Sequence, residues 1–225
     1  MSITPLEALQ RLQTGNQEFV AGLVNPAEHL KDLRWTPGNA RQRPFAVILG
    51  CSDSRVPVEV VFNQGFGDLF VIRVAGNIVA PSQIGSVEFA AEKFGTSLVV
   101  VLGHTHCGAI DATYEALTQR NGSSSRNLQA IVDRVSPAMK GLLKTDLRDN
   151  PALLKQAAVR TNISMAASFL RHGSRIIEQL VEQGELVVVG AEYSLETGVV
   201  DFFDGLPDTA PAGASEHLSG GPVQP

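Results

Sequence analysis

The sequence lacks the features that mark several large protein classes. Its uninterrupted apolar runs, such as residues 45–49 and 98–102, are about five residues long, far below the roughly 20 that span a bilayer. The N-terminus has neither a basic start nor an apolar core, so no secretory signal is expected. A net charge of -5 without a basic cluster argues against a nucleic-acid surface. We therefore expect a soluble, cytoplasmic protein that binds neither membrane nor nucleic acid.

Cysteine is scarce as well, with only Cys51 and Cys107 among 225 residues. The two could form a disulfide or serve as buried apolar side chains. A disulfide is the weaker interpretation, because the cytosol is reducing. His104, three residues before Cys107, makes metal binding the better one.

The chain length suits one large domain, or one domain with an added arm. Thr4, Pro5 and Glu7 form a capping-box start for an amphipathic helix over residues 5–20. Prolines and mixed charge over residues 23–44 suit a connecting arm. We expect an N-terminal helix and arm over 1–44, a catalytic domain over 45–205 and a flexible tail over 206–225.

Beyond the arm, apolar runs alternate with helical patterns. Strands are expected at 45–49, 69–73, 98–102, 186–190 and 199–203. Helices are expected at 56–62, at 83–94, from 109 to 117, and as two or three helices within 126–183, punctuated at Pro137, Pro151 and Gly173. Continuous apolar strands separated by helices predict an α/β fold, with a mainly parallel central sheet flanked by helices.

Polar motifs follow two of these strands. Cys51-Ser52-Asp53-Ser54-Arg55 comes after the first strand, and His104-Thr105-His106-Cys107 after the third. Ligands of open parallel sheets bind beyond the carboxyl ends of the strands. Two thiolates and an imidazole there favour zinc over calcium, magnesium or manganese. Cys51, His104 and Cys107 would leave a fourth position free for water or a carboxylate, as in catalytic zinc sites.

Asp53 and Arg55 add a carboxylate and a guanidinium beside the expected metal site. Asp53 could take the fourth zinc position or accept a proton from a zinc-bound water. The Arg55 fork would orient the carboxylate and keep it ionised. The alternatives are a surface ion pair, or an Asp53 that only caps the next helix.

The pattern Cys-x-Asp-x-Arg followed by His-x-x-Cys, each after an apolar strand, resembles the β-class carbonic anhydrases. Residues 70–77 and 103–109 extend the similarity, which covers roughly residues 40–205. The resemblance implies one zinc ion per chain, held by Cys51, His104 and Cys107. It also implies reversible hydration of carbon dioxide to bicarbonate and a proton by zinc-bound hydroxide, with Asp53 and Arg55 as the catalytic pair. In a closed, inactive state Asp53 would itself bind the zinc.

Pocket residues separate two subgroups of that family. The regulated type has a tryptophan three residues before the first cysteine, where this chain has Ile48, although Arg73 and Tyr193 match its other two positions. Those two residues are expected to make packing or polar contacts near an interface. The balance favours the plant-like type.

In the plant-like type, Gln42 and Phe70 match two substrate-pocket positions, and Phe89 stands where that type has a tyrosine. Gly108 completes the substrate-binding set that the resemblance implies. Core packing is an equal alternative for Phe70 and Phe89. His106 could shuttle protons, but a solvent-facing or capping role is favoured.

Competing functions use the same zinc site differently. One is hydrolysis of a sulfur analogue such as carbon disulfide, and another is a non-catalytic zinc protein that senses bicarbonate. A thiol redox protein using the two cysteines is a further alternative. The resemblance also implies a homodimer or homotetramer with an N-terminal helix exchanged between protomers.

Overall fold

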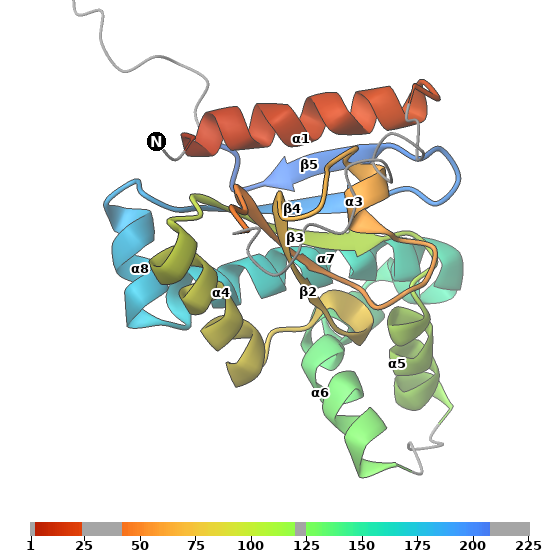
Figure 1. The fold of residues 1–225 in the computed structure, drawn as a ribbon. Coiled ribbons are helices and arrows are strands. Elements are labelled where there is room, and N and C mark those ends of the chain that lie inside the picture. Colours follow the sequence, from red (N-terminus) through yellow and green to blue (C-terminus); the bar gives the residue numbers. More distant parts are fainter. Residues whose placement is uncertain (1–2, 24–41, 120–124, 208–225) are drawn as a thin grey trace, which may run out of the picture.

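The computed structural model describes residues 3–23, 42–119 and 125–207. Its centre is a five-stranded sheet in the order β2-β1-β3-β4-β5 (Figure 1). The strands are β1 (Ala46–Gly50), β2 (Leu69–Arg73), β3 (Leu98–His104), β4 (Val187–Tyr193) and β5 (Val200–Asp204). The first four are parallel, and β5 runs antiparallel to β4. The predicted α/β fold with a mainly parallel sheet is confirmed.

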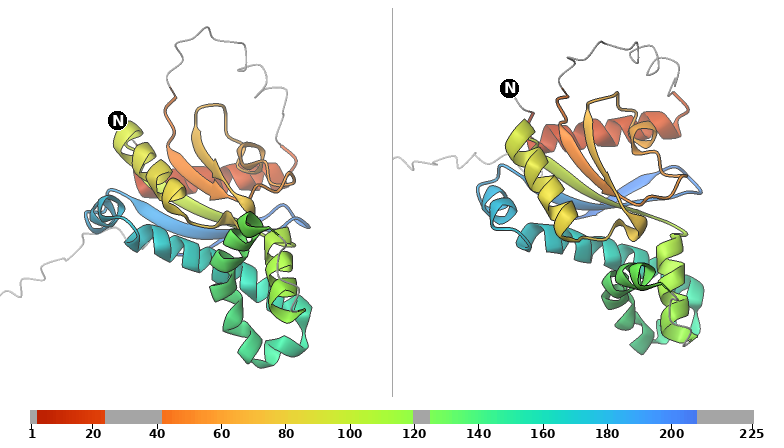
Figure 2. Two further views of the ribbon diagram at one scale, coloured as in Figure 1. Left: turned by 90° about the horizontal axis from the view of Figure 1, so that it is seen from below. Right: turned by 60° about the horizontal axis from the view of Figure 1, so that its bottom comes forward.

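Helices cover both faces of this sheet (Figure 2). They are α1 (Pro5–Val20), α3 (Val58–Val61), α4 (Pro81–Phe94), α5 (Gly108–Thr118), α6 (Arg126–Lys140), α7 (Pro151–His172) and α8 (Arg175–Glu182). Short 3-10 helices lie at Ala75–Asn77, Leu142–Lys144 and Asp146–Asp149. Helices α1 and α3 lie on one face, while α4, α7 and α8 lie on the other. Helices α5 and α6 extend away from the sheet on the α7 side (Figure 1).

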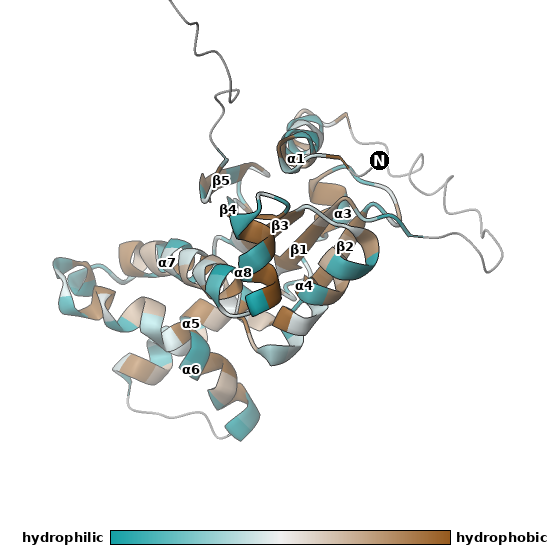
Figure 3. Ribbon diagram, turned by 90° about the vertical axis from the view of Figure 1, so that its left-hand side faces the viewer, coloured by the Kyte–Doolittle hydropathy of each residue, from teal (hydrophilic) through white to brown (hydrophobic). Residues whose placement is uncertain are grey.

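The central strands β1, β3 and β4 bury both of their faces, which explains their uninterrupted apolar sequences. Val47 and Leu49 of β1 belong to the core beneath α4, α7 and α8, whereas Ala46 and Ile48 belong to the core beneath α1 and α3. Side chains of a strand alternate between faces, so each face here needs its own apolar set. The hydrophobic strands lie between helices with more polar outer surfaces (Figure 3).

Helix α1 begins as its sequence predicts. The Glu7 backbone N–H donates to Thr4 Oγ1 at 3.2 Å, and the Thr4 N–H donates to Glu7 Oε2 at 2.8 Å. Ala8 and Leu12 are fully buried against the chain's own sheet. At the other end of the helix, Asn16 Oδ1 accepts the Val200 N–H at 2.8 Å. The apolar face of α1 therefore packs against the sheet of its own chain.

One boundary prediction was wrong. Pro137 does not interrupt its segment, because α6 runs through it from Arg126 to Lys140. A proline inside a helix removes one backbone hydrogen bond. The flanking turns bury Val135 and Met139 completely, and this packing holds the helix together.

Helix α7 lies close to the sheet because two strand positions lack a side chain. A Cβ at Gly103 would lie 2.5 Å from Ile163 Cδ1, and one at Gly190 would lie 2.8 Å from Ile163 Cγ2. The Ile163 side chain occupies the space above β3 and β4 that these glycines leave. This close packing fixes α7 over the carboxyl ends of the strands.

Some predictions concern residues that the structure does not describe. Most of the predicted arm, residues 24–41, and nearly all of the predicted tail, residues 208–225, lie outside the described residues. No helix within residues 3–23, 42–119 and 125–207 combines the length and apolar character needed to cross a membrane.

Candidate metal centre

Three predicted metal ligands meet at the carboxyl end of the sheet. Cys51 directly follows β1, His104 is the last residue of β3, and Cys107 is the N-cap residue of α5. Their ligand atoms all lie within 4.8 Å of one another. Because β1 and β3 are parallel neighbours, their ends meet at one edge, and the two motifs converge despite about fifty intervening residues.

The His104 ring is prepared to donate an electron pair. It is fully buried, and its Nδ1–H donates to the Thr105 carbonyl at 2.8 Å. Among the described residues its Nε2 has no hydrogen-bond partner. A buried ring nitrogen without a partner is costly unless an ion or a donor meets it. Two buried sulfurs lie beside it, and this donor set fits zinc.

The two thiols are free and buried. Cys107 donates a hydrogen bond to Cys51, which lowers the pKa of Cys51 against the opposing effect of burial, and the Gly76 N–H lowers it further. The same hydrogen bond, with burial, raises the pKa of Cys107. Cys51 is therefore the more readily ionised of the two thiols, and metal binding would release the proton that Cys107 retains.

Gly76 supports the first ligand from the 3-10 helix after β2. Its N–H donates to Cys51 Sγ at 3.3 Å. Its φ is +70°, and an added Cβ would lie 2.9 Å from the Ala109 side chain, so only glycine fits. Asn162 of α7 donates to the Gly76 carbonyl at 2.9 Å, which fixes this turn from the other side. Sequence reasoning included Gly76 only within a matching segment and missed Asn162.

Asp53 and Arg55 form a fork-to-fork pair beside the ligands. Arg55 Nε donates to Asp53 Oδ1 at 2.9 Å, and the second guanidinium contact, to Oδ2, is 2.8 Å. The Arg55 backbone N–H also donates to Oδ1, at 3.0 Å. These side-chain hydrogen bonds hold the pKa of Asp53 well below its usual range, although partial burial opposes them. Asp53 Oδ2 lies 3.9 Å from His104 Nε2.

Arg73 has a larger part in this site than sequence reasoning gave it. From the last position of β2 it donates to the Cys51 carbonyl at 2.9 Å and to the Asp53 carbonyl. The backbone of the turn that carries a ligand and the carboxylate is thus fixed by a neighbouring strand. The polar contacts expected of Arg73 are therefore these two hydrogen bonds, which hold the turn from Cys51 to Asp53.

Comparison with known proteins agrees with this geometry. A family model described as carbonic anhydrase matches residues 46–200. Carbonic anhydrase 2 of Mycobacterium tuberculosis is 36% identical over 196 residues, which cover 86% of this chain and 90% of that protein. The chain belongs to the β-carbonic anhydrase family. As a member of this family it is an enzyme of the carbonate dehydratase class.

Solved structures of β-carbonic anhydrases share the fold. The β-carbonic anhydrase CcaA is 28% identical, covers 88% of this chain and 95% of its own, and gives a TM-score of 0.65. A structure from a study of two tetrameric β-carbonic anhydrases of Sordaria macrospora is 20% identical, covers 79% and 89%, and also gives 0.65.

Behind the ligands of this carbonic anhydrase lies a polar network that sequence reasoning missed. Thr105 Oγ1 donates to Glu196 Oε2 at 2.9 Å and accepts the Leu195 N–H at 3.0 Å. The His106 ring contacts Glu196 Oε1, and the residue itself has a φ of +54°. The hydroxyl of Thr105, with His106 and Ser194, lowers the pKa of Glu196 to about 2. Glu196 thus braces the turn between His104 and Cys107.

The residues expected to bind substrate lie apart within one chain. Gly108 follows the Cys107 ligand, and a Cβ there would meet nothing within 4 Å. Phe70 and Phe89 instead pack together with Phe94, their ring centroids 6.1 Å apart. Phe70 pairs with the second residue of β1, so about 13 Å of strand separates it from the metal ligands. Gln42 is exposed beside Gly67.

Two of the positions compared with the regulated subgroup, Ile48 and Tyr193, are buried. Ile48 is fully buried in the core beneath α1. Tyr193, at the end of β4, belongs to the same core, and burial raises its pKa. Tyr193 pairs in register with His104 across the sheet. Each of the two therefore has a packing role.

Proposed function

We propose that this carbonic anhydrase binds one zinc ion per chain through Cys51, His104 and Cys107, and that it reversibly hydrates carbon dioxide there. The observation that carries the proposal is the His104 Nε2 atom, which is buried without a partner and converges with the two thiols. When bound, zinc supplies the Lewis acidity that makes hydroxide available from water near neutral pH. The chain's own residues do the positioning.

Asp53 is proposed as the hydrogen-bond acceptor that orients the attacking oxygen. Its low pKa keeps it ionised at neutral pH, so it accepts a hydrogen bond but does not retain a proton. Arg55 holds both carboxylate oxygens, which supports an arrangement with Asp53 turned away from the metal. The closed state, with Asp53 as the fourth ligand, requires these contacts to break.

Gly108 is proposed to leave room for the substrate. It begins α5, where the positive end of the helix dipole favours anions such as bicarbonate. The open space around its Cα supports this role.

Gln42, Phe70 and Phe89 are proposed to line a substrate pocket across a subunit interface. Because the strand separates Phe70 from the ligands of its own chain, it would serve the site of a second protomer. The edge position of β2 and the exposure of Phe66 and Phe89 support a homo-oligomer. The tetrameric assembly named for the Sordaria macrospora proteins supports a dimer or tetramer here.

Exchange of residues 1–44 between protomers stays a prediction. Helix α1 packs on its own chain, and the arm that would carry an exchange lies outside the described residues. A cytoplasmic location is likewise proposed, and the two free thiols support a reducing compartment.

Stopped-flow hydration of carbon dioxide, with zinc measured on the same sample, tests the proposal. We expect activity proportional to zinc content, loss on chelation and recovery when zinc is returned. A metal-free sample that hydrates carbon dioxide at the full rate would refute it. Carbon disulfide assayed in parallel distinguishes the competing hydrolase, which would turn over only the sulfur substrate.

A further inference from the structure

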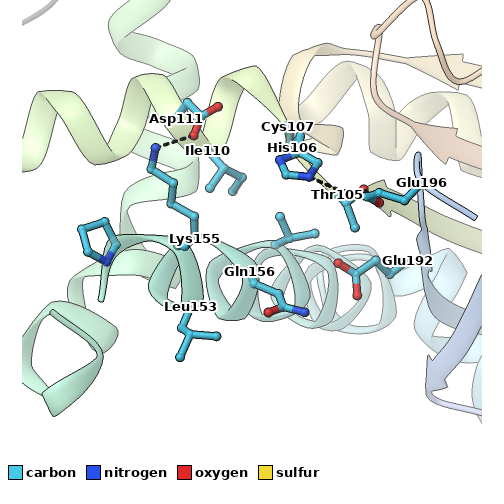
Figure 4. Close-up of a pocket in the computed structure, with 13 residues that line it drawn as sticks. Thr105, His106, Cys107, Ile110, Asp111, Leu153, Lys155, Gln156, Glu192 and Glu196 are labelled. Atoms are coloured by element: carbon cyan, nitrogen blue, oxygen red, sulfur yellow. Dashed lines mark hydrogen bonds and ion pairs between the residues drawn. The ribbon is translucent and has the colours of Figure 1, made fainter. Parts of the chain in front are cut away.

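A cavity lies behind the turn between His104 and Cys107. Its volume is about 570 Å³, within the range of small-molecule sites. Thr105, His106 and Cys107 form one side, and the first turns of α7 form the opposite side (Figure 4). Among the described residues, the lining does not include Cys51, Asp53 or Arg55. The cavity therefore adjoins the proposed metal centre only at Cys107 and does not include the catalytic pair.

Glu192 is the unusual residue of this cavity. Its side chain comes from β4 and turns toward the cavity (Figure 4), yet the residue is only 8% exposed. Oε2 accepts a hydrogen bond from Arg160 at 3.0 Å. Oε1 has no hydrogen-bond partner anywhere in the described part of the chain. A buried carboxylate oxygen without a donor is costly, so the site is built to receive one.

The neighbouring charges favour a cation as that donor. Asp111, Glu192 and Glu196 line the cavity, and each has a partner: Lys155 for Asp111, the His106 ring for Glu196 and Arg160 for Glu192. Arg160 is shared, because its Nη1 also lies 2.8 Å from Asp201 Oδ2. The Glu192 end therefore has two carboxylates against one guanidinium and keeps a surplus of negative charge.

The remaining lining favours an organic cation over a metal ion. Ile110, Pro151, Leu153 and Val159 provide apolar walls. Within the described residues, the one group of three or more metal-type ligands that converges is Cys51, His104 and Cys107, so the carboxylates here do not meet at a point. An inorganic cation would lack ligands, whereas an ammonium group on an apolar body would match both the charge and the walls.

We propose that this cavity binds a small primary ammonium ion with an apolar body, whose N–H groups donate to Glu192 Oε1. The apolar body packs against Ile110 and Leu153. Glu192, Ile110 and Leu153 have no part in the proposed hydration of carbon dioxide, and Cys107 is the one proposed zinc ligand that the lining includes.

Calorimetric titration of the zinc-loaded full chain with benzylammonium chloride tests this. We expect a dissociation constant of about 1 mM or lower, and at least about tenfold weaker binding of benzyl alcohol, which has the same shape without the charge. Glu192→Gln should weaken benzylammonium binding by about tenfold or more. Glu182→Gln, a matched change on the exposed face of α8, should leave it unaltered.

A second variant tests the cavity without replacing a buried residue. Ala152→Trp, at an exposed place on the cavity rim, should block binding by its volume without changing charge. If Glu192→Gln does not fold, this variant and the alcohol comparison decide the matter. No binding of benzylammonium, equal binding of the alcohol, or undiminished binding by either variant would overturn the proposal.

Discussion

The Arg55 guanidinium donates to both oxygens of the Asp53 carboxylate, at 2.9 and 2.8 Å, across only two positions of the chain. Oδ2 of the same carboxylate lies 3.9 Å from His104 Nε2, where a metal would bind. These contacts, which we call the Arg55–Asp53 clamp, keep the Asp53 carboxylate ionised and hold it away from the proposed metal position. The following predictions address this clamp, its surroundings and the sheet below.

Asp53→Asn should lower carbon dioxide hydration by about 100-fold or more, because an amide cannot replace an ionised acceptor. Zinc content should remain unchanged, since Asp53 is not one of the three ligands. Stopped-flow rates with metal analysis on the same preparation measure both. Asp149→Asn, an exposed aspartate far from the site in sequence, is the control and should keep full activity. Wild-type activity in Asp53→Asn would eliminate the proposed role.

Arg55→Met should make the stability of the metal-free protein less dependent on pH. The folded pKa of Asp53 is below its unfolded value of about 3.9, so the clamp stabilises the fold above that value. This contribution is lost as the pH falls through the folded pKa. The wild type should therefore exceed the variant in urea midpoint at pH 6, by a margin that narrows toward pH 3. A difference in urea midpoint that stays the same from pH 6 to pH 3 would show that the Arg55–Asp53 contact does not lower the pKa of Asp53.

Glu196→Ala should weaken zinc binding by about 10- to 100-fold, the usual effect of losing a group that orients a metal ligand. Glu196 acts through Thr105, whose carbonyl accepts the His104 Nδ1–H. Competition with a chromogenic chelator measures the affinity, and Glu182→Ala is the matched control. The account fails on this point if both variants hold zinc equally well.

Gly103→Ala should destabilise the fold by about 1–3 kcal/mol, because the new methyl group would overlap the Ile163 side chain. Ile163→Ala removes the overlapping atoms, so the double variant should be less destabilised than the two single changes added together. Urea unfolding of all four proteins gives the coupling. Strict additivity would show that Gly103 and Ile163 do not share this space.

The sequence predicted the strands well because parallel strands are buried on both faces, so each is marked by its own apolar run. The predicted strand 69–73 coincides with β2, and 98–102 differs from β3 only at its end. The convergence of Cys51, His104 and Cys107 was predictable because each follows such a run. The predicted break at Pro137 was wrong, because packing that only the folded chain supplies outweighs the local helix-breaking tendency of proline.

Supporting residues were harder to find, because their partners lie far away in the sequence. Asn162 contacts Gly76 across 86 residues, and Glu196 contacts Thr105 across 91. Neither is near a motif. Glu192 lies in β4 but beyond the predicted strand 186–190, so nothing in the sequence indicated that it is buried. Charged side chains are rarely buried unless they are paired, and Glu192 is paired through one of its two oxygens.

X-ray absorption spectroscopy at the zinc edge of the full-length enzyme tests the central claim most directly. The account predicts two sulfur ligands at about 2.3 Å, one imidazole nitrogen at about 2.0–2.1 Å and one further light ligand. Cys107→Ser should reduce the sulfur count from two to one, or abolish binding. A zinc ion surrounded only by nitrogen and oxygen, with both cysteines free to react with a thiol reagent, would contradict the account.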